Sequence, residues 1–162
     1  MGLDQKDIKI LKALEDLETT STEAVSNSTG IPLSTIHYRL NNLRDTGVIK
    51  NDRLDIDLDE IGLGVTILVE VFTNDDQNHT KSGKEIAQIG GVTKLFFTMG
   101  GTDFIALARL PDSDSVERLI SDFEDLDVVR RTDSTFVIER ELDSHYPFQQ
   151  YDEETLTDSL VE

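Results

Sequence analysis

The stretch GIPLSTIHYRLNNLRDTGVI, residues 30–49, contains the pattern of one helix and of the turn that precedes it. Apolar residues recur at helical spacing at Ile36, Leu40 and Leu43, which places them on one side of a helix. Gly30 stands before this helix, where a glycine that ends a preceding helix is expected. Two short helices joined by a tight turn with a glycine are typical of a helix-turn-helix motif, so the stretch predicts the second helix of such a motif.

The residues before this stretch predict two more helices. Asp4 can cap the start of the first helix, whose apolar residues recur at three-residue steps from Ile8 to Leu17. A run of threonine and serine over residues 19–22 breaks that stripe and can start a short second helix. Together with the quoted stretch, these helices predict a winged-helix-like helix-turn-helix domain over residues 1–50.

After residue 50 the apolar residues change from helical spacing to alternation. The acidic residues 51–61 predict a hinge that contains a short strand. Residues 62–140 then predict strand, helix, strand, strand, helix and strand, which is the βαββαβ order of a ferredoxin-like domain and makes the chain an α+β protein. Residues 141–162 hold seven acidic residues and no lysine or arginine, and we expect a flexible tail there.

Apolar residues occupy both faces of the predicted sheet. In the first predicted strand, for example, Ile67 faces one side and Leu68 faces the other. Two helices cover only one face of a four-stranded sheet, so the other face needs a second copy of the chain to bury it. The pattern therefore predicts a homodimer that forms sheet to sheet.

The chain carries 33 acidic and 15 basic side chains, a formal charge of −18, and this excess argues against a nucleic-acid partner. The acidic residues are unevenly distributed, however, because residues 30–44 contain two arginines and no carboxylate. Plentiful aspartate with little lysine is also typical of a halophilic archaeon, whose proteins work in a very salty cytosol. If such a protein binds DNA, we expect its affinity to fall less steeply with rising KCl concentration than counterion release predicts, or even to increase. A KCl titration of DNA binding measures this.

Several classes of protein are excluded by what the sequence lacks. With no cysteine, it offers no disulfide, thiolate zinc site or thiol nucleophile. The three histidines, His37, His79 and His145, lie in separate segments without a second ligand at metal-binding spacing. No apolar run approaches the roughly 20 residues that span a membrane, and the polar N-terminus is not a signal peptide. We therefore predict a cytoplasmic protein that is not an enzyme and holds no metal or cofactor.

The outward face of the third helix offers candidate DNA contacts. With the apolar stripe turned inward, hydroxyl, amide and aromatic side chains face outward and suit base edges, while arginines suit phosphates. The candidate DNA-binding residues are Ser34, Thr35, His37, Tyr38, Arg39, Asn41, Asn42 and Arg44. A three-helix module for protein interaction is the alternative interpretation of the same pattern.

The quoted stretch resembles the recognition segment of the Lrp/AsnC, or feast/famine, family of transcriptional regulators. LDQKDIKIL at residues 3–11 is similar to the first helix of that family, and GGTDF at residues 100–104 resembles part of its ligand-sensing domain. The resemblance covers residues 3–140. It implies a regulator that binds double-stranded DNA sequence-specifically and forms dimers that assemble to tetramers or octamers. It also implies a small effector, such as an amino acid, that binds between subunits and changes assembly or DNA affinity.

The resemblance further implies where the effector binds. The residues that match the family's glycine-and-acid turn are Gly100, Gly101, Thr102 and Asp103. Glycines expose backbone N–H groups to a carboxylate, and Asp103 can pair with an ammonium group. In the alternative interpretation, the two glycines only make a tight turn, which Asp103 caps.

Two further functions stay open. Relatives often carry lysine or arginine where this chain has Tyr38, Asn41 and Asn42, so the chain is also compatible with a sensor that binds an amino acid or a partner protein but no DNA. The siroheme decarboxylases share the two-domain architecture and would bind a tetrapyrrole. Colour carried through purification would favour such an enzyme.

Overall fold

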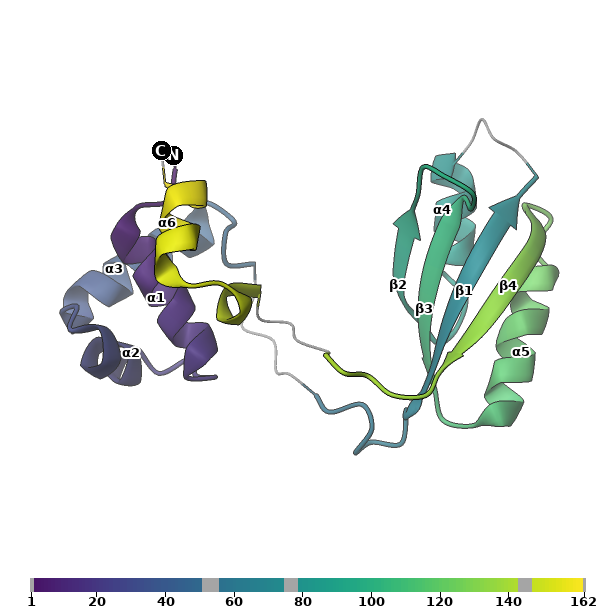
Figure 1. The fold of residues 1–162 in the computed structure, drawn as a ribbon, viewed down its shortest axis with the longest axis horizontal. Helices are drawn as coiled ribbons and strands as arrows, with labels where there is room; N and C mark the ends of the chain where they lie inside the picture. Colours follow the sequence, from purple (N-terminus) through teal and green to yellow (C-terminus); the bar gives the residue numbers. More distant parts are fainter. Residues whose placement is uncertain (1, 51–55, 75–78, 143–146, 162) are drawn as a thin grey trace. The chain divides into compact units, whose positions relative to one another are not determined.

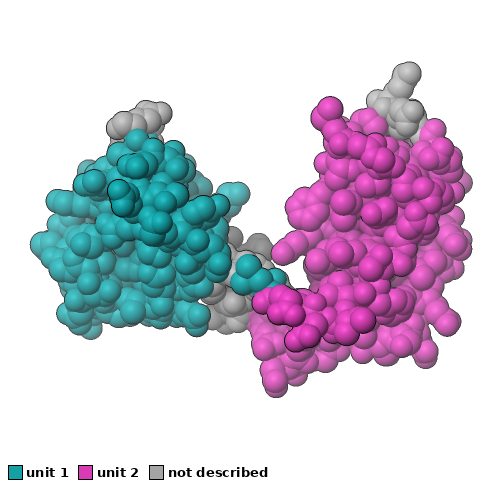
Figure 2. All heavy atoms as spheres, in the orientation of Figure 1, with its two compact units in different colours: residues 1–54, 142–162 teal, residues 55–141 magenta. Residues whose placement is uncertain are grey.

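The computed structural model describes residues 2–50, 56–74, 79–142 and 147–161. The chain forms two compact units, which are coloured separately in Figure 2. The helical unit comprises residues 1–54 and 142–162, and the sheet unit comprises residues 55–141. Each unit has its own hydrophobic core, so each is described by itself.

The helical unit begins with three helices, as the sequence predicted. They are α1 (Gln5–Asp16), α2 (Thr22–Thr29) and α3 (Leu33–Asp45), shown in Figure 1. Asp4 caps α1, because its side chain accepts hydrogen bonds from the backbone N–H groups of Lys6 and Asp7. Gly30 ends α2 in the left-handed conformation, at φ 71°, which a glycine adopts without strain. The shared core of the three helices consists of Ile10, Ala13, Val25, Ile31, Ile36, Leu40 and Leu43.

The acidic C-terminal segment is folded, whereas the sequence predicted a flexible tail over residues 141–162. It forms the short 3₁₀ helix η1 (Pro147–Gln150) and the helix α6 (Glu153–Leu160), and both pack against α1 (Figure 1). Leu156 of α6 is buried. Ile8 of α1 is also fully buried although it does not belong to the three-helix core, which indicates that α6 covers that side of α1.

Polar contacts hold the C-terminal segment on α1. The backbone N–H of Phe148 donates to a carboxylate oxygen of Glu15 at 2.7 Å. The Nζ of Lys12 donates to the carbonyl oxygen of Phe148 at 3.2 Å. At the other end of the segment, Val161 pairs with Leu3 in an isolated parallel bridge. The flexible-tail prediction is wrong because these contacts join residues that are far apart in the sequence.

The hinge predicted over residues 51–61 contains a turn in its described part. Residues 51–55 lie outside the described residues. The Asp57 side chain accepts hydrogen bonds from the backbone N–H groups of Asp59, at 2.9 Å, and Glu60, at 3.2 Å. Aspartate that bonds to the backbone two residues on is typical of a turn. This local bonding explains why the described part is a turn instead of the predicted short strand.

Asp59 fixes this turn to the sheet unit. Its carboxylate oxygens pair with Arg109 and Arg140, and the distance to Nη2 of Arg109 is 3.2 Å. Arg109 is buried, and its Nε also donates to the carbonyl oxygen of Leu63 at 3.1 Å. The end of the hinge is therefore part of the sheet unit.

The sheet unit has the predicted βαββαβ order. Its elements are β1 (Val65–Thr73), α4 (His79–Ile86), β2 (Val92–Phe97), β3 (Phe104–Leu110), α5 (Ser113–Glu124) and β4 (Val129–Val137). The strands lie antiparallel in the order β2-β3-β1-β4. Both helices pack on one face, where Ile67, Ala106 and Phe123 belong to the core (Figure 1). The α+β class is therefore confirmed.

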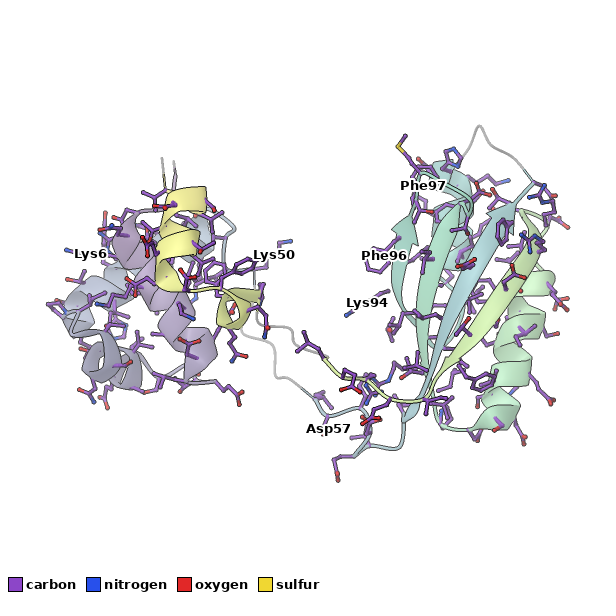
Figure 3. The ribbon with its side chains drawn as sticks, in the orientation of Figure 1. Lys6, Lys50, Asp57, Lys94, Phe96 and Phe97 are labelled. Carbon is purple, nitrogen blue, oxygen red and sulfur yellow. The ribbon has the colours of Figure 1, made fainter. Side chains whose placement is uncertain are left out.

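The opposite face of the sheet, which we call the open face, carries apolar residues across β1, β2 and β3, as the alternation predicted. Leu68 of β1 lies opposite Leu107 of β3, and Phe96 of β2 lies opposite Ile105 of β3, so these four residues share the open face. Phe96 is 55% exposed, and Leu68 is 37% exposed. Figure 3 shows Phe96 and Lys94 projecting from the same side of β2.

Candidate functional site

The outward face of α3 carries most of the predicted DNA-contacting side chains. Ile36, Leu40 and Leu43 are buried in the three-helix core, as their spacing predicted. In the predicted set, the exposed residues are Ser34, His37, Tyr38, Asn41 and Arg44, and the half-buried residues are Thr35, Arg39 and Asn42. Tyr38 is 67% exposed, which is a large fraction for an aromatic residue. The helix thus presents hydroxyl, amide and imidazole groups to its surroundings.

Arg39 differs from these residues because two carboxylates hold its guanidinium. Its Nη1 donates to both carboxylate oxygens of Asp4, each at 2.7 Å, and to Oδ1 of Asp7 at 2.8 Å. The Arg39 side chain is only 20% exposed. Burial alone would raise the pKa of Asp4 and lower that of Arg39, but the hydrogen bonds between them outweigh burial. The pKa of Asp4 is therefore lowered, and the pKa of Arg39 is raised.

A shallow cavity of about 200 Å³ opens beside this ion pair. It is lined by Tyr38, Arg39, Asn42, Leu43 and Thr46 from α3 and its end, by Val48, and by Gly2, Leu3, Asp4 and Asp7 from the start of the chain. The outward face of α3 and the start of α1 therefore meet at one place.

Lys6 adds a positive charge at the start of α1. It is exposed, and its backbone N–H donates to Asp4, the residue that holds Arg39. Figure 3 shows its side chain projecting away from the helical unit. The sequence pattern drew attention to the third helix alone, so it did not single out Lys6, which is bonded through its backbone to the residue that holds Arg39.

The four residues predicted to bind an effector lie in the turn between β2 and β3 (Figure 1). Gly100 and Gly101 are exposed, and no atom lies within 4 Å of the position that a Cβ would take at either residue. Neither glycine has a positive φ. The backbone of this turn therefore does not require glycine for steric reasons.

Thr102 and Asp103 tie the turn to the end of β1. Oγ1 of Thr102 donates to the carbonyl oxygen of Val71 at 3.1 Å. Oδ2 of Asp103 accepts hydrogen bonds from the backbone N–H of Thr73 at 2.7 Å and from its hydroxyl at 3.0 Å. Asp103 therefore caps the end of β1, whereas the alternative interpretation expected it to cap the turn of the two glycines. The second carboxylate oxygen, Oδ1, accepts no hydrogen bond from the residues that the structure describes.

Aromatic rings lie beside this turn. The rings of His79, at the start of α4, and Phe97, at the end of β2, are in contact, with their centroids 4.2 Å apart and their planes tilted by 34°. The centroid of the Phe104 ring lies 5.4 Å from the centroid of the Phe97 ring. Nδ1 of His79 is buried and has no hydrogen-bond partner within the described part of the chain. The sequence predicted no metal-binding role for His79, and the spacing of residues does not reveal which ring its imidazole contacts.

Two kinds of site are absent from residues 2–50, 56–74, 79–142 and 147–161. No three His, Asp or Glu side chains in these ranges come close enough together to hold a metal ion. No helix in the same ranges is long and apolar enough to cross a membrane.

The chain matches two family models in turn. Residues 3–50 match a winged helix-turn-helix DNA-binding domain, and residues 65–147 match the Lrp/AsnC ligand binding domain. The HTH-type transcriptional regulator AldR of Mycolicibacterium smegmatis is 31% identical over 121 residues, which are 73% of this chain and 70% of AldR. The HTH-type transcriptional regulator LysM of Sulfurisphaera tokodaii is 28% identical over 84% of this chain and 95% of LysM.

A solved structure shares the fold over nearly the whole chain. A transcriptional regulator of Neisseria meningitidis in complex with L-methionine aligns with a TM-score of 0.81, over 89% of this chain and 95% of its own. Its sequence identity is 20%, so the likeness shows the fold alone. The matched relatives are transcriptional regulators and not enzymes.

Proposed function

The chain belongs to the Lrp/AsnC family of transcriptional regulators, and from that premise we propose how its parts divide the function. It is a helix-turn-helix regulator with a ligand-binding domain, and not an enzyme. In our proposal the outward face of α3 reads operator DNA, the turn between β2 and β3 binds an amino acid, and the open face joins two copies in the cytoplasm. No match supports a siroheme decarboxylase.

The accessible polar face of α3 supports the DNA-reading proposal. In a helix-turn-helix motif, the second helix lies in the major groove, and α3 is that helix. His37, Tyr38 and Asn41 are exposed on it, and their side chains carry groups that hydrogen-bond to base edges. Phosphate contacts fall to exposed cations such as Arg44 and Lys6.

Selection from random-sequence DNA tests this proposal. The wild-type protein is expected to enrich a two-part site whose halves lie about 10 base pairs, or a multiple of that spacing, apart. Tyr38→Ala is expected to bind the enriched site about tenfold more weakly, because it removes a contact to a base edge. Tyr151→Ala removes a tyrosine that is 52% exposed elsewhere in the helical unit, and should bind as the wild type does. A wild-type protein that enriches no sequence would support the sensor that does not bind DNA.

The turn between β2 and β3 has the groups that an amino acid needs. In our proposal, Oδ1 of Asp103 binds the ammonium group, and the backbone N–H groups of Gly100 and Gly101 bind the carboxylate. The Phe97 ring offers an apolar surface to the ligand's side chain. The related regulator of Neisseria meningitidis was crystallised with L-methionine, which is a ligand of this chemistry.

Thermal melting with each of the twenty amino acids tests the effector site. An amino acid present at 100 times its Kd is expected to stabilise the protein by about 2.7 kcal/mol and so to raise the melting temperature by several degrees. Asp103→Asn is expected to abolish that rise, whereas Asp122→Asn, a change at an exposed acid on α5, should keep it. Each variant is compared with its own ligand-free melt, because Asp103 also caps β1. If no amino acid shifts the wild-type melt, the effector proposal is wrong.

A second copy of the chain is the proposed partner of the open face. Its four apolar residues form one surface across β1, β2 and β3. Glu70 and Lys94 lie on the same face, since Glu70 is opposite Ile105 and Lys94 is opposite Leu107. A face with both charges can complement itself across a two-fold axis. Further assembly of such dimers would give the tetramers or octamers that the family resemblance implies.

A further inference from the structure

Arg39 joins the middle of α3 to the start of α1. Its Nη1 donates to both carboxylate oxygens of Asp4 at 2.7 Å and to one oxygen of Asp7 at 2.8 Å. The exposed fractions of the side chains are 20% for Arg39, 15% for Asp7 and 52% for Asp4. Two of the three charged groups are thus largely out of solvent. Breaking such a contact is costly, because a charge left without its partner keeps its desolvation penalty.

This arrangement argues against a phosphate contact by Arg39. To reach DNA, the guanidinium would have to leave both carboxylates, and Asp7 would stay largely buried without its cation. Nε of Arg39 is also buried, with no hydrogen-bond partner among the described residues, so this donor does not face the solvent in which a phosphate would lie. Partial desolvation would raise the pKa of Asp4, but hydrogen bonds from Arg39 and from the backbone lower it, so the carboxylate stays charged at neutral pH and keeps hold of Arg39.

Asp4 connects this contact to the placement of the reading helix. The same carboxylate caps α1 by accepting hydrogen bonds from the backbone N–H groups of Lys6 at 2.8 Å and Asp7 at 2.9 Å. One side chain therefore starts α1 and also holds α3. Tyr38 and Asn42 line the cavity beside Asp4, so a change in this contact moves side chains that face the DNA in our proposal.

We propose that Arg39 is a positioning residue, which sets the orientation of α3 on α1 through Asp4 and Asp7 and does not touch the DNA backbone. This inference rests on the proposed reading of DNA by α3. It has an unusual consequence for Asp4. Replacing Asp4 removes a negative charge, and this effect alone would strengthen the attraction to DNA. In our proposal the same replacement weakens DNA binding, because it removes the carboxylate that holds α3.

Salt titrations of the affinity for the selected operator test this proposal. Arg39→Gln and Asp4→Asn are each expected to bind about tenfold more weakly than the wild type, which is within the range of coupling between contacting residues. Both should keep the wild-type slope of log affinity against log salt. The control Arg44→Gln is expected to make the slope shallower by about 0.9 for each phosphate contact that it removes. Arg39→Lys, which can still pair with the carboxylates, should recover part of the affinity with the slope unchanged.

A double variant completes the test. Asp4→Asn combined with Arg39→Gln should lose no more affinity than Arg39→Gln alone, because Arg39→Gln already removes the contact with Asp4. Tighter DNA binding by Asp4→Asn would overturn the proposal, and so would an Arg39→Gln slope reduced like that of Arg44→Gln. Melting curves identify any variant that does not fold, and Asp7→Asn then takes its place. A wild-type protein that binds no DNA would overturn the proposed function itself, and this is seen before any variant is compared.

Discussion

The Phe96→Glu variant is expected to be monomeric and to bind its operator on the order of 100-fold more weakly than the wild-type protein. Phe96 is 55% exposed on the open face, beside Ile105. A glutamate at this position would have to lose its hydration when the two faces meet, and the apolar contact of the ring would be lost. Without the dimer, the two copies of α3 bind DNA one at a time, and the gain from linked binding is lost.

Phe136→Glu is the matched control for this experiment. Phe136 is 57% exposed, but it lies opposite Ile67, a core residue, and therefore on the other face of the sheet. This variant should remain dimeric and keep its affinity. Sedimentation equilibrium measures the assembly, and a DNA titration at the same protein concentration measures the binding. If Phe96→Glu sediments as a dimer, another surface makes the dimer contact.

Leu156→Ala is expected to destabilise the helical unit by about 2–4 kcal/mol. Leu156 is 5% exposed and lies on α6, which packs against α1. Its truncation leaves a cavity that the surrounding helices fill only in part. In a domain of this size, each kcal/mol lowers the melting temperature by about 4–8 °C, so the helical transition should fall by roughly 10 °C or more. Circular dichroism at increasing temperature measures this change.

Leu160→Ala controls for the loss of a leucine from the same helix. Leu160 is 41% exposed, and changes at such surface positions alter stability by about 0.5 kcal/mol or less. The two variants also have the same composition and charge. Equal melting curves for Leu156→Ala and the wild type would show that burial of this leucine adds nothing to the stability of the helical unit.

The reading helix could be predicted from the sequence because the forces that form it are local. Three apolar residues at helical spacing bury one side of α3, and Gly30 provides the left-handed turn before it at φ 71°. The residues that face outward follow from the same spacing, which is why the exposure of Tyr38 and Asn41 could be predicted as well. Alternation along β1 predicted its two faces for the same reason.

The partner of a side chain depends instead on contacts between distant parts of the chain. Arg39 and Asp4 are 35 residues apart, and no spacing rule connects them. The folding of the C-terminal segment was still harder to predict, because Phe148 and Glu15 are 133 residues apart. In addition, a single buried leucine among many acidic residues produces little periodicity in α6. The described part of the hinge differs from the predicted short strand for a local reason. The side chain of Asp57 bonds to the backbone and outweighs a short alternation of apolar residues.

The bridge between Leu3 and Val161 brings both ends of the described chain together. The sheet unit, residues 55–141, is therefore topologically an insertion within the helical unit. A circular permutant that joins the neighbouring ends by a short peptide should keep the helical unit intact. On the ribosome, α1 is synthesised before the sheet unit, and α6 emerges only after the whole sheet unit has been made. The helical unit thus starts before the sheet unit during translation but is completed only after it.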